Sequence, residues 1–140
     1  MSFRGKTVVI TGASSGIGAA ACVEFAKRGA NLALVARRKE KLEGLEKTLA
    51  KFGVSTLVCE CDVSDKAQVK KMSSQVIEKF GGINVLVNNA GFAIYGAISE
   101  LTVEEIESQM ETNYFGMVYC TKSFLPKMLE QKSGHIVNVA

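Results

Sequence analysis

The sequence has 140 residues, of which 47% are hydrophobic and 22% are charged, a composition typical of a single globular domain and not of a disordered chain. The net charge of +3 comes from 17 basic and 14 acidic residues that are scattered along helix-like stretches. No basic run with interleaved aromatic residues indicates nucleic-acid binding. No apolar run reaches the roughly 20 residues of a membrane helix, and no signal-peptide core precedes the first strand. We therefore expect a soluble, cytoplasmic protein.

The cysteines have no metal-binding pattern. Cys22, Cys59, Cys61 and Cys120 show no Cys-x2-Cys spacing. Cys59 and Cys61 would share one face of a strand, but the single histidine, His135, is distant in sequence. We therefore expect buried, reduced thiols and no metal site, in keeping with a reducing compartment.

Apolar β-branched runs alternate with amphipathic stretches along the whole chain. The predicted strands are residues 7–10, 31–36, 54–61, 83–87 and 135–139. The predicted helices are residues 19–28, 39–51, 65–80, 102–110 and about 112–130. This alternation predicts one α/β domain over residues 1–140, with a doubly wound, Rossmann-like parallel sheet and right-handed crossovers.

Three local features refine the predicted helices. Thr102 and Glu105 have the spacing of a capping box, and Ser64 or Asp65 would cap the helix that follows. Pro126 falls in the last stretch of the long helix, where we expect a kink or a local break.

A glycine-rich stretch, Thr-Gly-Ala-Ser-Ser-Gly-Ile-Gly, occupies residues 11–18 between the first strand and the first helix. A helix N-terminus offers unpaired N–H groups and the positive end of the helix dipole, so it binds anions. Gly12 would allow a sharp turn, Gly16 a close approach of the backbone to a diphosphate, and Gly18 tight packing of helix against strand. The expected ligand is a dinucleotide.

The Gly-x3-Gly-x-Gly spacing of this loop resembles the short-chain dehydrogenase/reductase family, whose phosphate loop reads Thr-Gly-x3-Gly-Ile-Gly. The resemblance extends over essentially all 140 residues but covers only about the first half or more of a typical family member. The strands and helices of the C-terminal part of the family fold are therefore expected to be absent. The resemblance implies that the following loop residues bind the cofactor: Gly12, Ser14, Ser15, Gly16, Ile17 and Gly18.

The residues at the end of the second strand bear on whether the cofactor is NAD or NADP. NAD-selective folds usually carry an acidic side chain there, whereas this chain has Ala36 followed by Arg37 and Arg38. A missing carboxylate removes repulsion against a 2′-phosphate, and a guanidinium can bind that phosphate. In the family this pattern accompanies NADP preference, with Arg37 the stronger candidate and Arg38 and Lys41 its neighbours. The alternative is that both arginines simply begin a solvated helix.

Two further strand ends match family motifs. Asp62 and Val63 correspond to the pair beside the adenine, although Asp62 could equally be a turn residue. Asn89, Ala90 and Gly91 belong to an Asn-Asn-Ala-Gly sequence after the fourth strand, where small residues would leave room for ribose and nicotinamide.

The catalytic residues are incomplete in these 140 residues. Asn113 matches the family's helix asparagine, whose main-chain carbonyl holds a water that serves the catalytic lysine. The family serine would follow Ala140, and the Tyr-x3-Lys pair would lie further on. Tyr119 precedes Lys122 by three residues and so lacks the i, i+4 geometry. We expect this chain to be inactive alone.

The resemblance implies an NADP-dependent oxidoreductase that transfers hydride between the nicotinamide and a carbonyl or alcohol substrate, and a homo-oligomer when complete. The alternative is a non-catalytic dinucleotide-binding module or redox sensor. A nucleotide-sugar epimerase would typically carry a Gly-x2-Gly-x2-Gly loop, which this sequence lacks. We also expect an unpartnered edge on the last strand and unpartnered apolar side chains on the long helix, namely Tyr114, Phe115, Val118, Phe124 and Leu125.

Overall fold

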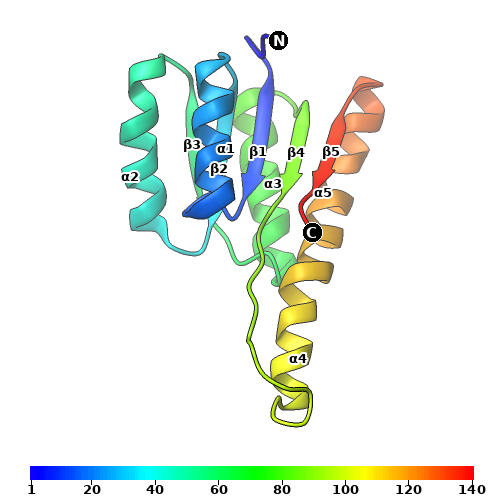
Figure 1. Cartoon of the computed structure of the whole chain (residues 1–140). Coiled ribbons are helices and arrows are strands. Elements are labelled where there is room, and N and C mark those ends of the chain that lie inside the picture. The colour runs from blue at the N-terminus through cyan, green and yellow to red at the C-terminus, as the bar shows by residue number, and fades with distance from the viewer.

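A computed structural model describes residues 1–140 (Figure 1). It contains a five-stranded sheet in the order β3-β2-β1-β4-β5, and every neighbouring pair is parallel. The strands are β1 Thr7–Thr11, β2 Asn31–Ala36, β3 Thr56–Glu60, β4 Val85–Asn88 and β5 His135–Asn138. The predicted α/β class and Rossmann-like parallel sheet are therefore confirmed.

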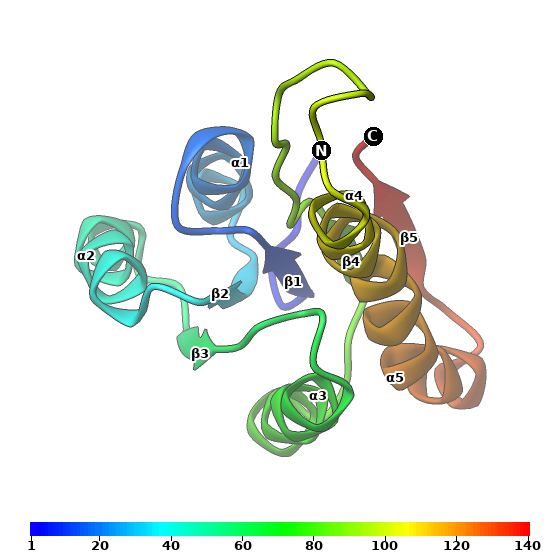
Figure 2. The same ribbon diagram turned by 90° about the horizontal axis from the view of Figure 1, so that it is seen from below.

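Helices cover both faces of this sheet, as seen along the strands in Figure 2. They are α1 Gly16–Lys27, α2 Lys39–Leu49 with the short 3-10 turn η1 Ala50–Phe52, α3 Lys66–Phe80, α4 Val103–Met110, η2 Glu111–Phe115 and α5 Gly116–Gln131. α1 and α2 lie on one face, and α3 and α5 lie on the other.

The strands separate two apolar clusters because successive side chains of a strand point to opposite faces. On β1, Val8 and Ile10 pack with α1 and α2, whereas Val9 packs with α3 and α5. All residues of β1 are buried, as is usual for a parallel strand covered on both faces. Two apolar clusters, one on each face of the sheet, therefore hold the carboxyl ends of β1, β2 and β4 in fixed positions.

Both expected helix caps are present. Thr102 and Glu105 form a complete capping box at α4. The Asp65 carboxylate accepts hydrogen bonds from the backbone N–H groups of Ala67 and Gln68 at α3. The hydrogen bond from Gln68 is the largest cause of the lowered pKa of Asp65, so this carboxylate stays charged at the positive end of the helix dipole.

Of the kink or local break expected at Pro126, the break does not occur, because α5 continues through this residue to Gln131. The irregularity lies instead at η2, a π-helical turn in which the Gly116 N–H donates to the Glu111 carbonyl. One continuous helical rod therefore runs through α4, η2 and α5. The two helices predicted over residues 102–110 and 112–130 are parts of this rod.

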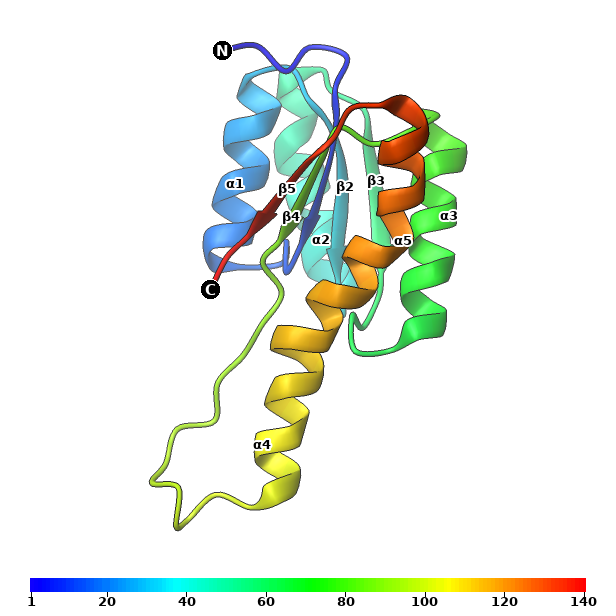
Figure 3. The same cartoon turned by 90° about the vertical axis from the view of Figure 1, so that its right-hand side faces the viewer.

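The amino-terminal part of this rod projects beyond the sheet, together with the chain that precedes it (Figures 1 and 3). The chain leaves β4, runs alongside α4 to the tip of the projection, and turns back into the helix. Tyr95 and Ile98 in this segment are 93% and 78% exposed. Residues 92–110, called the arm below, are thus only partly packed against the rest of the chain.

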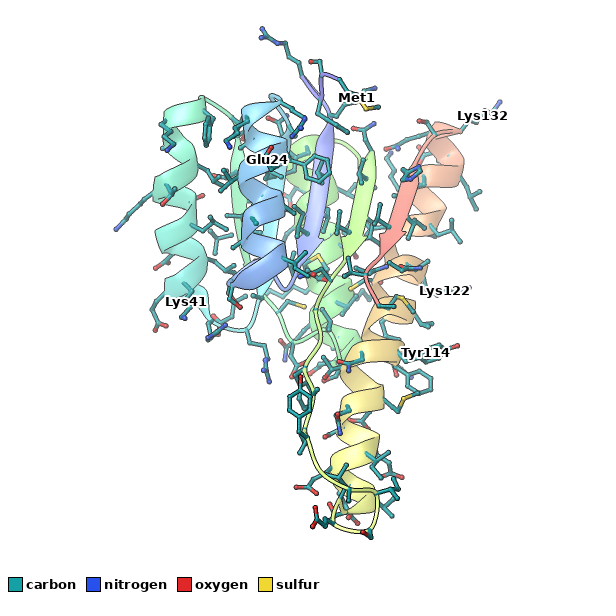
Figure 4. All side chains as sticks on the ribbon, in the orientation of Figure 1. Met1, Glu24, Lys41, Tyr114, Lys122 and Lys132 are labelled. Carbon is teal, nitrogen blue, oxygen red and sulfur yellow. The ribbon has the colours of Figure 1, made fainter.

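The expectation of unpartnered apolar residues on the long helix holds only in part. Tyr114 and Phe115 are exposed, and Tyr114 projects from the side of the helix that faces away from the chain after β4 (Figure 4). Phe124, by contrast, is fully buried in the cluster beneath α3 and α5, so the prediction was wrong for this residue. β5 lies at the sheet edge and is mostly exposed.

All four cysteines are free and buried, as predicted. Burial raises the pKa of Cys22, Cys61 and Cys120 to about 12 and that of Cys59 to about 11. Because the thiolate is the reactive form, these side chains behave as small apolar groups. No helix of the structure has the length and apolar character required to cross a membrane.

Candidate cofactor site

A cavity of about 450 Å³ opens at the carboxyl ends of the central strands. Ligands of open α/β sheets bind at this edge, where the strand order reverses. All the predicted cofactor-binding residues except Gly18 line the cavity. They are Gly12, Ser14, Ser15, Gly16, Ile17, Arg37, Arg38, Asp62, Val63, Asn89, Ala90 and Gly91, and the structure adds Ala36, Cys61, Phe92 and Thr112.

The glycines of the loop after β1 meet three different requirements. Gly12 and Gly16 have φ angles of +67° and +54°, a region that favours glycine. A side chain at Gly12 or Gly18 would collide with neighbouring atoms. Gly18 is buried and does not line the cavity, and a Cβ there would lie 2.2 Å from the Gly12 carbonyl oxygen, so this position requires glycine.

The amino end of α1 faces the cavity with unpaired donors. The helix begins at Gly16, earlier than predicted, and the Ser15 side chain makes no capping hydrogen bond. The backbone N–H groups of Gly16, Ile17 and Gly18 have no protein acceptor. A Cβ placed on Gly16 would meet no atom within 4 Å, so the backbone is open to a ligand there. Such a helix start can bind an anion of the size of a phosphate.

Thr11 joins the two sides of the cavity. Its hydroxyl oxygen accepts hydrogen bonds from the N–H groups of Asn89 and Ala90, each at 3.0 Å. The Asn89 side chain donates in return to the carbonyl oxygens of Thr11 and Gly12 at 3.2 and 3.4 Å. Sequence reasoning placed Thr11 in the loop motif but assigned it no role. Thr11 is buried and directly precedes Gly12, and only the structure shows that its hydroxyl bridges the ends of β1 and β4.

The basic side chains after β2 differ in their contacts. Arg38 reaches across the loop after β1 and donates to the hydroxyl oxygens of Ser14 at 3.1 Å and Ser15 at 3.3 Å. Arg37 lines the cavity without such a hydrogen bond. The structure therefore places the guanidinium of Arg38, and not that of the preferred candidate Arg37, against the loop after β1.

Asp62 serves a local turn as well as lining the cavity. Its carboxylate accepts from the Ser64 N–H at 3.0 Å and from the Ser64 hydroxyl at 2.7 Å. The neighbouring Val63 packs so closely against Gly116 that a Cβ there would lie 2.6 Å from a Val63 methyl carbon. The wall of the cavity formed by Asp62 and Val63 is thus fixed both by its own turn and by the start of α5.

Asn113 lies beside the cavity but does not line it, whereas the adjacent Thr112 does. Its side chain makes two hydrogen bonds with the backbone of Phe92: the Phe92 N–H donates at 2.9 Å, and the Asn113 amide donates to the Phe92 carbonyl at 2.7 Å. Asn113 sits within η2, the π-helical turn. Such turns are frequent at functional sites, since they locally change which groups a helix presents.

Comparison with known proteins assigns the family. The family model described as short chain dehydrogenase matches residues 6–140. The chain belongs to the short-chain dehydrogenase family.

Relatives in sequence are oxidoreductases. An uncharacterized oxidoreductase of Mycobacterium bovis is 41% identical over 98% of this chain and 42% of its own length. An uncharacterized oxidoreductase of Staphylococcus aureus is 37% identical over 96% of this chain and 58% of its own length. The chain therefore spans about half the length of the relatives it matches.

Solved structures of similar proteins show the same fold. A xylitol dehydrogenase with bound NAD+ has a TM-score of 0.96 and 30% identity over all of this chain and 54% of its own. An alcohol dehydrogenase from the archaeon Thermococcus sibiricus, in complex with 5-hydroxy-NADP, has a TM-score of 0.90 and 36% identity over 94% of this chain and 57% of its own.

Proposed function

We propose that the protein is an NADP-dependent oxidoreductase, that residues 1–140 form its dinucleotide-binding domain, and that the cavity at the strand ends is its cofactor site. The observation that carries this proposal is the open amino end of α1 beside the Arg38 guanidinium. The unpaired N–H groups of Gly16, Ile17 and Gly18 would hold the diphosphate.

The preference for NADP over NAD rests on the end of β2. Ala36 stands where a carboxylate would accept hydrogen bonds from an unphosphorylated ribose. Arg38, Arg37 and the hydroxyl of Ser14 surround this end of the cavity and would bind a 2′-phosphate through charge-assisted hydrogen bonds. The structural neighbours include NAD+-bound and NADP-bound proteins, so the preference depends on these residues alone.

The remaining cavity residues would position the rest of the cofactor. Asp62 and Val63 would lie beside the adenine, and Asn89, Ala90 and Gly91 beside the ribose and nicotinamide. When bound, the reduced nicotinamide would supply a hydride to a carbonyl carbon, and the oxidised form would accept one from the carbon that bears an alcohol. The protein's part is to bind and orient this group against the ends of β1 and β4.

The proton transfer that accompanies hydride transfer needs further residues. We propose Asn113 as the asparagine of the catalytic set, acting through its main-chain carbonyl and a water. No tyrosine among these 140 residues is followed by a lysine four residues later, so we propose that this chain binds the cofactor but does not turn over substrate alone. The complete protein would be a cytoplasmic homo-oligomer acting on a small carbonyl or alcohol.

The second candidate function, a non-catalytic dinucleotide-binding module, would use the same open amino end of α1. Oxidation of NADPH with a panel of ketones separates the two. Turnover by the 140-residue chain at a rate typical of a whole enzyme would contradict the proposed inactivity. Recovery of turnover in a longer chain that carries the serine and the Tyr-x3-Lys pair would support the oxidoreductase over the module.

Titration of the protein with NADPH and with NADH, followed by nicotinamide fluorescence, tests the cofactor proposal. We expect NADPH to bind at least about tenfold more tightly, since a charge-assisted hydrogen bond contributes about 1.5 kcal/mol or more. Tighter binding of NADH would contradict the role proposed for the residues after β2.

A further inference from the structure

Polar side chains along the rod α4-η2-α5 bind the chain from residue 83 to residue 94 in reverse order. Near the carboxyl end of α5, Gln131 makes two hydrogen bonds with the backbone of Ile83, at 3.1 and 2.7 Å. Further back, the hydroxyl of Thr121 accepts from the Asn88 side chain at 3.1 Å. Asn113 then binds the backbone of Phe92, and Gln109 accepts from the Ile94 N–H at 3.0 Å.

This reverse order is physically possible because the two segments have matching lengths. From Gln109 to Gln131 the helical rod extends about 33 Å, at about 1.5 Å per residue. An extended chain from Ile83 to Ile94 reaches about 36 Å, at about 3.3 Å per residue. The rod and the chain can therefore run side by side over their whole length, as Figures 1 and 3 show.

Gln109 makes the outermost of these contacts. Its amide oxygen accepts from the Ile94 N–H, and its amide nitrogen donates to the Glu105 carbonyl at 3.1 Å. The second hydrogen bond ties the amide group to its own helix and so orients the oxygen toward the chain. The Ile94 N–H has no backbone acceptor, so Gln109 is its one protein partner.

The contact lies two residues beyond Phe92, which lines the cavity. Asn113 fixes Phe92 itself, and Gln109 fixes the chain that continues from it into the exposed part of the arm. Without the Gln109 contact, the hydrogen bonds of Asn113 would be the ones left between the rod and the backbone of residues 92–94, and the chain from residue 93 onward could move away from α4. The orientation of Phe92 toward the cavity would then depend on the two hydrogen bonds of Asn113 alone.

We propose that Gln109 is a positioning residue for the nicotinamide-side wall of the cofactor cavity. It holds the Ile94 N–H so that the segment from Phe92 onward stays extended along α4. The role rests on the proposed function in one respect: the wall that Phe92 forms is assigned to the nicotinamide end of the cofactor. Gln109 touches neither cofactor nor substrate and acts through the backbone.

Two substitutions separate this role from a general effect on stability. Gln109→Met keeps the length of the side chain but removes the acceptor, whereas Gln109→Glu keeps an acceptor oxygen. Gln75→Met, at an exposed position of α3 with no side-chain hydrogen bond, is the matched control. The first measurement is hydrogen exchange of the Ile94 amide in each protein, with the amides of β1 as internal standards.

We expect Gln109→Met to speed exchange at Ile94 about fivefold, the effect of losing one hydrogen bond, and to leave β1 unchanged. Gln75→Met should retain the protection of the parent protein, whereas Gln109→Glu, which keeps the acceptor oxygen but loses the donor to the Glu105 carbonyl, should retain only part of it. Unchanged exchange at Ile94 in Gln109→Met would overturn the proposal. Equal acceleration at Ile94 and throughout β1 would also overturn it, because it would indicate a general loss of stability.

The second measurement compares NADPH with 2′,5′-ADP, which contains only the adenosine half of the cofactor. Gln109→Met should weaken NADPH binding about fivefold and leave 2′,5′-ADP binding unchanged, because a wall that is less often in place lowers the apparent affinity. Equal weakening of both ligands, or of neither, would overturn the assignment to the nicotinamide side. If the parent protein binds neither ligand, the proposed function fails, while the exchange at Ile94 still decides whether Gln109 holds the segment.

Discussion

The two halves of the sheet are held in place differently. The half formed by β1, β2, α1 and α2 is held by apolar packing, and its strands are almost entirely buried. The half formed by β4, β5 and the helical rod adds long-range side-chain hydrogen bonds, and β5 and the arm are exposed. The end of the cavity beside α1 is therefore fixed by the core, whereas the opposite end depends on a few polar contacts.

The largest expected effect is on the free energy of unfolding, when a buried and an exposed aromatic residue of the rod are each replaced by alanine. Phe124→Ala removes a fully buried ring from the cluster under α3 and α5 and should cost about 4 kcal/mol of unfolding free energy. Phe115→Ala, at a residue that is 43% exposed, should cost less than about 1 kcal/mol. Urea unfolding of both variants checks this, and equal costs would show that the rod is not docked as described.

A smaller effect is expected at the packed end of the phosphate loop. Gly18→Ala forces a methyl group to within 2.2 Å of the Gly12 carbonyl oxygen and should cost about 3 kcal/mol. Gly44→Ala in α2 is the matched control, since its methyl group meets no atom within 4 Å, and it should stabilise the helix by about 0.5 kcal/mol. Thermal unfolding measures both. A neutral Gly18→Ala would mean that helix and loop are further apart than the structure shows.

The next effect concerns the two arginines after β2. Arg38→Ala removes the guanidinium that contacts Ser14 and Ser15 and should weaken 2′,5′-ADP binding about tenfold. Arg37→Ala should weaken it less, since Arg37 makes no hydrogen bond to the loop. Calorimetric titration of the two variants decides between them. A greater loss for Arg37→Ala would restore the order of candidates that the sequence suggested.

The last effect, that of the buried thiols, is absent near neutral pH and appears only in alkaline solution. Their pKa values are raised by burial from an ordinary value of 9.0, to about 12 for Cys22. The unfolded chain therefore loses these protons first, so the associated stability is complete below about pH 9 and is lost as pH rises toward 12. Urea midpoints should fall over this alkaline range, and the native thiols should resist alkylation at about pH 8. Rapid alkylation of the native protein would contradict their burial.

Much of the architecture follows from local sequence signals. The alternation of β-branched runs with amphipathic stretches predicts all five strands, because buried parallel strands and two-faced helices have distinct periods. The loop glycines, the capping box at Thr102 and the small residues after β4 were likewise visible, since each meets a local backbone or space requirement.

Three features were not predictable in this way. The π-helical turn η2 adds one residue to a helical turn, a change too small to alter the apolar pattern on either side. Arg37 and Arg38 have equal local chemistry, and only the path of the chain after β2 decides which one reaches Ser14. The contacts of Gln109 and Gln131 join residues far apart in sequence, where no spacing rule applies.

The central claim is that the cavity at the strand ends binds a phosphorylated nicotinamide dinucleotide. Nuclear magnetic resonance titration of isotope-labelled protein with NADPH tests this most directly. The account predicts shifts at the amides of residues 12–18, at Arg38, at Asp62 and Val63, and at residues 89–92. Shifts confined to other surfaces, or no shifts at millimolar NADPH, would contradict it.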